Sequence, residues 1–185
     1  MIPEIKKKTE DRMQGVIDGL KHEFATIRTG RASLHLLDDI KVDYYGTMTP
    51  ISQVATLGIP DARTITIQPW ESKIIPQIEK SIQKADLGLT PMNDGKLIRL
   101  VVPPLTEERR KELVKKSKKM GEDTKVGIRN VRREANEALK KAEKDKDITE
   151  DELKKGEQEV QHMTDDFIKR IDDALHHKEQ EIMEV

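Results

Sequence analysis

Residues 103–111 read Pro103-Pro104-Leu105-Thr106-Glu107-Glu108-Arg109-Arg110-Lys111, and they open the stretch that decides the fold. After them come helix-forming residues without another proline as far as the break at Asp145–Ile148. A helix of about forty residues is roughly 60 Å long, twice the usual diameter of a small domain. Thr106 is a favourable N-cap for it, and the two glutamates that follow stand at the positive end of the helix dipole. The sequence therefore predicts one long rod.

Two further helices are predicted from apolar residues that recur every three or four positions. The first begins at Pro3 and stops at Thr29-Gly30, and the last begins at Thr149, which forms a Thr-x-x-Glu capping box with Glu152. The expected buried stripes of the three helices are Met13, Ile17, Leu20, Phe24 and Ile27; Leu113, Met120, Ile128, Val131, Ala135, Leu139 and Ala142; and Leu153, Val160, Phe167, Ile171 and Leu175. Three such helices form a bundle.

Between residues 31 and 104 the apolar pattern alternates instead. It predicts strands at 40–44, 65–67 and 97–102, turns at 60–62 and 93–95, and a helix over 74–85 with Pro76 in its first turn. The predicted fold class is α+β. A long three-helix bundle of residues 1–30 and 105–185 carries an inserted small β/α/β domain of residues 31–104.

Composition excludes several classes of protein. The 185 residues are 37% charged and only 3% aromatic, which favours extended helices over a thick core. Absence of cysteine excludes disulfides, thiolate metal sites and thiol catalysis, and fits a reducing compartment. Neither a signal core nor a run of about twenty apolar residues is present. We expect a cytoplasmic protein that does not use a membrane.

The net charge of −1 conceals a segregation of charge along the chain. Residues 105–148 carry fifteen Lys and Arg against ten Asp and Glu, whereas residues 149–185 carry five against twelve. One interpretation is a complementary antiparallel helix pair, with ion pairs from Arg132 or Arg28 to the acidic helix. The other starts from Arg129, Arg132 and Arg133, which fall within about a third of the helix circumference, away from the buried stripe. Clustered guanidinium forks suit phosphate.

Other constellations indicate no enzyme. His22, His35, His162, His176 and His177 lack the spacing of a metal site, and Gly95-Lys96 lacks the remainder of a phosphate loop. Tyr44-Tyr45 is interpreted as a cross-strand pair beside a turn at Gly46, with a stacking platform as the alternative. Because no nucleophile, base and orienting group assemble, we expect neither cofactor nor catalysis.

Five segments together point to a known family: Ile27–Ala32, Tyr44–Gly46, Asp86–Leu89, Pro103–Lys111 and Ile128–Ala135. On these segments the whole chain resembles the bacterial ribosome recycling factors. It departs from the family at Thr90, where members often have asparagine, and at Met163, where leucine is common. Neither departure touches the arginines.

The resemblance implies an L-shaped molecule in which two hinge strands join the bundle to the β/α/β domain. The implied hinge residues are Thr29, Gly30, Arg31, Pro103, Pro104 and Leu105. It also implies a monomeric, non-enzymatic factor that binds 23S ribosomal RNA of the large ribosomal subunit after termination. With elongation factor G and its GTP hydrolysis, such a factor splits the ribosome into subunits. The residues expected to bind RNA are Arg132, Arg129, Arg28, Arg133 and Arg110, with Lys125 as an auxiliary contact.

Two other classes of function stay open at this point. A helical adaptor or chaperone would grip protein partners, and such a grip needs an exposed apolar groove. An enzyme would need an unrecognised site in the inserted domain. The arginine cluster favours RNA binding over the first, and the absence of a catalytic constellation counts against the second.

Overall fold

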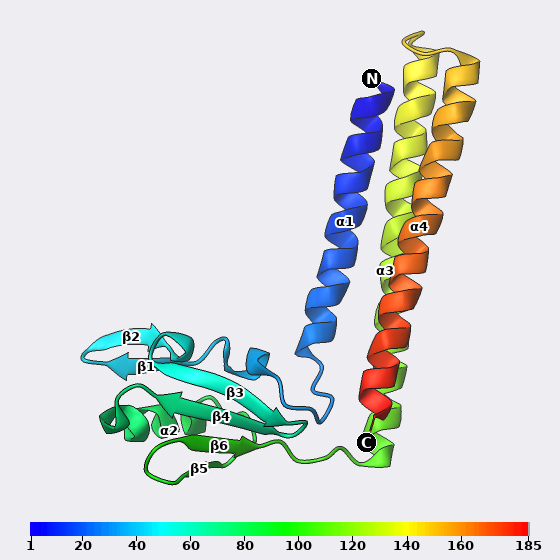
Figure 1. Ribbon diagram of the computed structural model, residues 1–185. Helices are drawn as coiled ribbons and strands as arrows, with labels where there is room; N and C mark the ends of the chain where they lie inside the picture. Colours follow the sequence, from blue (N-terminus) through cyan, green and yellow to red (C-terminus); the bar gives the residue numbers. More distant parts are fainter. Residues whose placement is uncertain (185) are drawn as a thin grey trace. The chain divides into compact units, whose positions relative to one another are not determined.

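The computed structural model describes residues 1–184, which form two compact units. The helical unit comprises Met1–Ile27 and Glu107–Glu184, and the inserted unit comprises Arg28–Thr106. Long helices packed as a bundle, with a β-sheet domain inserted between the first and the second of them, confirm the predicted α+β fold class (Figure 1). The exact domain limits and the hinge stay predictions.

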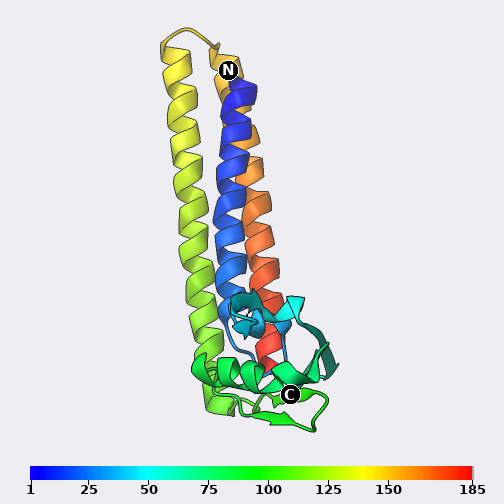
Figure 2. The ribbon, with the colours of Figure 1, turned by 90° about the vertical axis from the view of Figure 1, so that its left-hand side faces the viewer.

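Three helices build the helical unit: α1 (Ile2–Thr26), α3 (Glu107–Lys144) and α4 (Glu150–Met183). They lie side by side along their lengths (Figure 2). Pro3 lies in the first turn of α1, and Thr149 and Glu152 form the expected capping box of α4. With 38 residues, α3 is about 57 Å long. Within residues 1–184 no helix is both long and apolar enough to cross a membrane.

The buried faces of α3 and α4 differ in part from the predicted apolar stripes. Met120, Leu153 and Leu175 are only half-buried. Small residues are buried in addition, namely Ser117, Gly121, Gly156 and Thr164. The Ser117 and Thr164 hydroxyls donate to carbonyls of their own helices, at 2.9 and 2.8 Å, which removes the cost of burying them. A stripe predicted from apolar residues alone could not include them.

Glycine lets α3 and α4 approach closely. A Cβ at Gly121 would lie 3.2 Å from the Leu175 side chain, and a Cβ at Gly156 would lie 3.1 Å from that of Leu139. Each glycine costs about 1 kcal/mol of helix propensity relative to alanine. Packing between α3 and α4 therefore compensates for the low helix propensity of these glycines.

The inserted unit contains a two-stranded and a four-stranded antiparallel sheet. Strands β1 (Lys41–Tyr44) and β2 (Thr47–Pro50) form a hairpin, and the larger sheet has the order β3-β4-β6-β5. Its strands are β3 (Ala55–Asp61), β4 (Thr64–Pro69), β5 (Pro91–Asn93) and β6 (Ile98–Val101). Short 3-10 helices η1 (Leu34–Leu37), η2 (Ile51–Gln53) and η3 (Ser72–Ile74) complete it, and η3 leads into α2 (Ile75–Lys84).

The sequence did not predict three of these strands. Both β2 and β5 are short edge strands with little apolar content, and β3 contains Gly58 and Pro60, which count against a strand. The strand pairing shifts register between Gly58 and Asp61, and this irregularity accommodates the proline. The turn expected at residues 60–62 is consequently at Ala62-Arg63.

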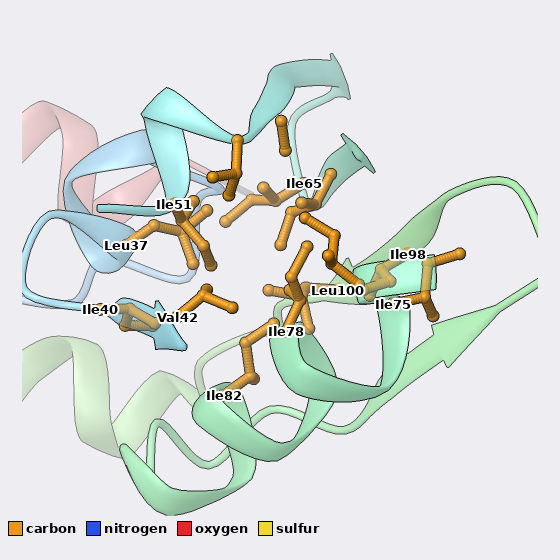
Figure 3. Close-up of a cluster of buried hydrophobic side chains, with 14 residues drawn as sticks. Leu37, Ile40, Val42, Ile51, Ile65, Ile75, Ile78, Ile82, Ile98 and Leu100 are labelled. Atoms are coloured by element: carbon orange, nitrogen blue, oxygen red, sulfur yellow. The ribbon is translucent and has the colours of Figure 1, made fainter. Parts of the chain in front are cut away.

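Aliphatic side chains fill the inserted unit. Helix α2 places Ile75, Ile78 and Ile82 against Ile65 of β4 and the β6 residues Ile98 and Leu100 (Figure 3). Leu37, Val42 and Ile51 enter the same cluster from η1, β1 and η2. The inserted unit is therefore a closed body with its own core.

Candidate nucleic-acid interface

Three arginines on the second half of α3 form a surface that we call the arginine face: Arg129, Arg132 and Arg133. Ile128, Val131 and Ala135 are buried, and this orients the helix so that the arginines point out of the core. Arg129 and Arg133 are exposed, whereas Arg132 is half-buried. The periodicity of the sequence thus placed this cluster correctly on the helix.

Arg132 contacts α4 through a neutral side chain. Its Nη1 donates to Oε1 of Gln161 at 3.2 Å, and Nε2 of Gln161 donates to Oδ1 of Asp165 at 2.9 Å. Within residues 1–184, Arg132 has no carboxylate at salt-bridge distance, so an interhelical ion pair does not occupy it. One N–H of its five is engaged, and the positive charge is not cancelled by a direct partner.

The other two members of the arginine face make no contact with α4 among the described residues. Arg133 donates to Oδ1 of Asn130 on the same helix. In the described part of the chain, Arg129 has no hydrogen bond or ion pair. Their guanidinium donors are therefore directed at solvent, where they can bind a ligand that supplies acceptors.

Lys125 is placed differently from the arginines. Its Nζ lies 2.6 Å from Oδ1 of Asp172 on α4 and 3.2 Å from Oε1 of Glu122, and its side chain is 14% exposed. The hydrogen bond to Asp172 raises the pKa of Lys125. A phosphate contact at Lys125 stays a prediction, and it would have to replace or share this interhelical pair.

Arg110 lies on α3 apart from the arginine face, and Arg28 belongs to the other unit. Arg110, half-buried in the first turn of α3, is nineteen residues from Arg129, which is about 28 Å along the helix axis. The Arg110 Nε atom is buried without a hydrogen-bond partner among the described residues. Arg28 belongs to the inserted unit, where its Nη1 donates to the carbonyl of Leu87 at 2.5 Å. RNA contacts by either arginine stay predictions.

The acidic helix α4 receives cations from both neighbouring helices. Lys125 and Lys140 of α3 reach Asp172 and Glu157, the latter at 3.9 Å, and Lys6 of α1 reaches Glu159 at 2.7 Å. The charge segregation thus serves in part as complementarity within the bundle, as the first interpretation of the sequence held. The arginine face does not take part in these ion pairs.

Tyr44 and Tyr45 converge on one carboxylate. Their hydroxyls donate to the two oxygens of Glu71 at 2.9 and 2.6 Å, and these hydrogen bonds lower the pKa of Glu71. The expected pairing of the two tyrosines across strands is wrong. Tyr44 pairs with Thr47 across the hairpin, and Tyr45 lies in the turn itself at φ 51° because the chain reverses there with Gly46.

The partners of Arg132 were not identified from the sequence. Gln161 and Asp165 are four residues apart, a spacing that brings side chains together on a helix, but nothing local showed which α3 residue they face. Among residues 1–184, no three His, Cys, Asp or Glu side chains gather in a way that could hold a metal ion.

Comparison with known proteins places these features in a family. The sequence profile described as "Ribosome recycling factor" matches residues 20–183. The ribosome-recycling factor of Trichlorobacter lovleyi is 64% identical over 94% of each chain, and that of Oleidesulfovibrio alaskensis is 59% identical over 96% of this chain and 97% of the relative.

Solved structures agree with the sequence relatives. A solution structure of the ribosome recycling factor superposes with a TM-score of 0.78 at 42% identity, covering 100% of this chain and 98% of the other. A second chain comes from models of the T. thermophilus ribosome recycling factor and the E. coli elongation factor G bound to the E. coli post-termination complex. It has a TM-score of 0.66 and 44% identity, and each chain is covered completely.

Proposed function

The chain belongs to the ribosome recycling factor family of non-enzymatic translation factors, and on that premise we propose that its arginine face binds phosphates of 23S ribosomal RNA. The factor itself would then contribute binding and shape, and the hydrolysis of GTP would belong to a partner. Membership of the family concerns ribosome recycling as a whole and does not specify which residues contact RNA.

One observation carries the proposal. Arg129, Arg132 and Arg133 have no carboxylate partner within residues 1–184, although the neighbouring helix α4 is rich in Asp and Glu. Folded RNA presents closely spaced phosphates, and a guanidinium can bridge two phosphate oxygens with parallel hydrogen bonds. Recognition of the RNA backbone requires no stacking aromatics, and the helical unit has none exposed among its described residues.

We further propose that the chain acts on the post-termination ribosome together with elongation factor G. A structural relative carries that description, and the likeness extends over the whole chain. Hydrolysis of GTP by the elongation factor would drive separation of the subunits in the cytoplasm, with the chain acting as a monomer. The large subunit would be held by the helical unit.

The two covalent connections between the units are proposed as the hinge. Ala32 N donates to the Ala62 carbonyl at 2.7 Å, and Val102 N donates to the Arg63 carbonyl at the same distance. These two backbone hydrogen bonds attach both connections to the β3–β4 turn. Residues 29–31 and 103–105 lie beyond the hydrogen-bonded residues, and Gly30, at φ 78°, adopts a conformation that few other residues can take. Motion would be confined to these two short segments.

The adaptor alternative has no structural support. In the described part of the helical unit, the exposed large apolar side chains are Met1, Val126 and Met183. The first and the last lie at the two ends of helices and Val126 lies in the middle of α3, so the three form no groove. A protein grip would need a continuous apolar surface.

Co-sedimentation with isolated large subunits across a salt series tests the RNA contact. Arg132→Ala should weaken binding and reduce the slope of log affinity against log salt by about 0.7–0.9, because one phosphate contact is lost. Circular dichroism and thermal melting should be unchanged. Arg99→Ala, which removes an exposed arginine from the inserted unit, is the charge-matched control and should bind like the original chain. An unchanged salt slope for Arg132→Ala would refute the proposal.

A further inference from the structure

The hydrogen bonds that link Arg132, Gln161 and Asp165 can donate in only one direction along the chain. Arginine carries only hydrogen-bond donors and an ionised carboxylate carries only acceptors. The Gln161 amide between them satisfies both neighbours in one orientation alone, with its oxygen toward Arg132 and its nitrogen toward Asp165. Asp165 thereby orients the amide, and the amide in turn orients the guanidinium.

The partner of Arg132 on α4, Gln161, is also unusual because it carries no charge. Two other cations that cross from α3 to α4, Lys125 and Lys140, meet the carboxylates of Asp172 and Glu157. Residues 149–185 contain twelve Asp and Glu, so a carboxylate would be the ordinary partner on this helix. Arg132 instead meets a neutral amide.

We propose that Gln161 is a positioning residue for Arg132. The Gln161 amide orients the Arg132 guanidinium toward its ligand and, because the amide is neutral, it leaves the positive charge available to phosphate. This inference rests on the proposed function of the arginine face. Arg132 keeps four N–H donors besides the one that it gives to Gln161, enough for the paired hydrogen bonds of a phosphate fork. A flexible arginine would have to lose side-chain freedom on binding, whereas a tethered one has already lost part of it.

Substitutions at position 161 separate the two roles of the amide. Gln161→Ala removes the tether and keeps the charge of Arg132, so ribosome affinity should fall about fivefold, the effect of one modest hydrogen bond, with an unchanged salt slope. Gln161→Glu replaces the amide with a carboxylate. The resulting ion pair should weaken binding further and lower the salt slope toward that of Arg132→Ala.

Gln158 offers a matched control one turn earlier on α4. It is exposed and has no hydrogen-bond partner in the described residues. Gln158→Ala repeats the truncation, and Gln158→Glu adds the same negative charge without placing it against Arg132. Both control variants should bind with nearly the original affinity and salt slope.

A double-mutant cycle and a spectroscopic measurement complete the test. In an Arg132→Ala background, the substitutions at Gln161 should have no further effect on affinity. In the free protein, NMR of the Arg132 guanidinium should show faster rotation of its Nη groups in Gln161→Ala than in Gln158→Ala. Thermal melting of each variant reports whether the bundle is intact.

The outcomes distinguish the two proposals. If Arg132→Ala binds normally, the RNA contact of the arginine face is wrong and the positioning role falls with it. If Arg132→Ala weakens binding but Gln161→Ala behaves like Gln158→Ala, the RNA contact stands and the positioning role alone is wrong. Equal effects of Gln161→Ala with and without Arg132 would also overturn it.

Discussion

The helical unit and the inserted unit are stabilised in different ways. The inserted unit closes around 14 buried aliphatic side chains contributed by its helices, its strands and the segments between them (Figure 3). The helical unit instead packs along three long helices, where small residues allow close approach of α3 and α4 and ion pairs connect neighbouring helices. A closed core makes the inserted unit one body, whereas three long helices leave an extended surface on which cations can be displayed.

The largest effect is expected from a substitution that disrupts the core of the inserted unit and leaves the helical unit unchanged. Ile78 is fully buried, so Ile78→Ala should destabilise the inserted unit by about 2–5 kcal/mol through lost burial and a residual cavity. Native-state hydrogen exchange, which reports each unit separately, is the measurement. Ile59→Ala, at a side chain that is 43% exposed in the same unit, is the control and should cost much less. Equal acceleration of exchange in both units would show that they unfold together.

Alanine substitutions at three glycines test how closely the helices pack. At Gly156 a Cβ would meet Leu139, which is fully buried, so Gly156→Ala should destabilise by about 1–3 kcal/mol through overpacking. At Gly121 the neighbour is Leu175, which is only half-buried and is therefore less constrained by packing than Leu139, and Gly121→Ala should be close to neutral.

Gly15 supplies the reference for this series. It is exposed, and nothing lies within 4 Å of the position that an added Cβ would take, so Gly15→Ala should stabilise α1 by about 0.5–1 kcal/mol. Urea unfolding of the three variants gives the three free energies. The same sign for all three would mean that close packing does not decide the outcome at Gly156.

The smallest effect concerns pH and the hairpin tip. Hydrogen bonds from Tyr45 and Tyr44 lower the pKa of Glu71 below that of the unfolded chain. The stability from this contact is therefore present above an unfolded pKa of about 4.3 and is lost as pH falls through the lower folded pKa. Tyr44→Phe with Tyr45→Phe should abolish this contribution.

NMR titration of the Glu71 carboxyl carbon measures this contribution directly. The pKa of Glu71 should rise toward its ordinary value in the double variant. The pKa of Glu159, which the hydrogen bond from Lys6 lowers in the helical unit, is the internal control and should not move. A Glu71 pKa that stays low without the two hydroxyls would assign its shift to another cause.

Recognition of the candidate site from the sequence was uneven. The shared azimuth of Arg129, Arg132 and Arg133 follows from helix periodicity, so the arginine face was predictable. Arg28 and Arg110 entered only through the family resemblance. Lys125 was expected only as an auxiliary phosphate contact, and no local pattern indicated that Asp172 of another helix lies 2.6 Å from it.

The sequence by itself determined the three long helices, their caps and breaks, and most of their buried faces, because spacing, capping and proline act within a few residues along the chain. Only the tertiary structure decided that Ser117 and Thr164 are buried, that three further strands pair, and that Gln161 faces Arg132. These features depend on the rotation and stagger of one element against another. Contacts between segments distant in the chain set both, and the local pattern of either segment does not contain them.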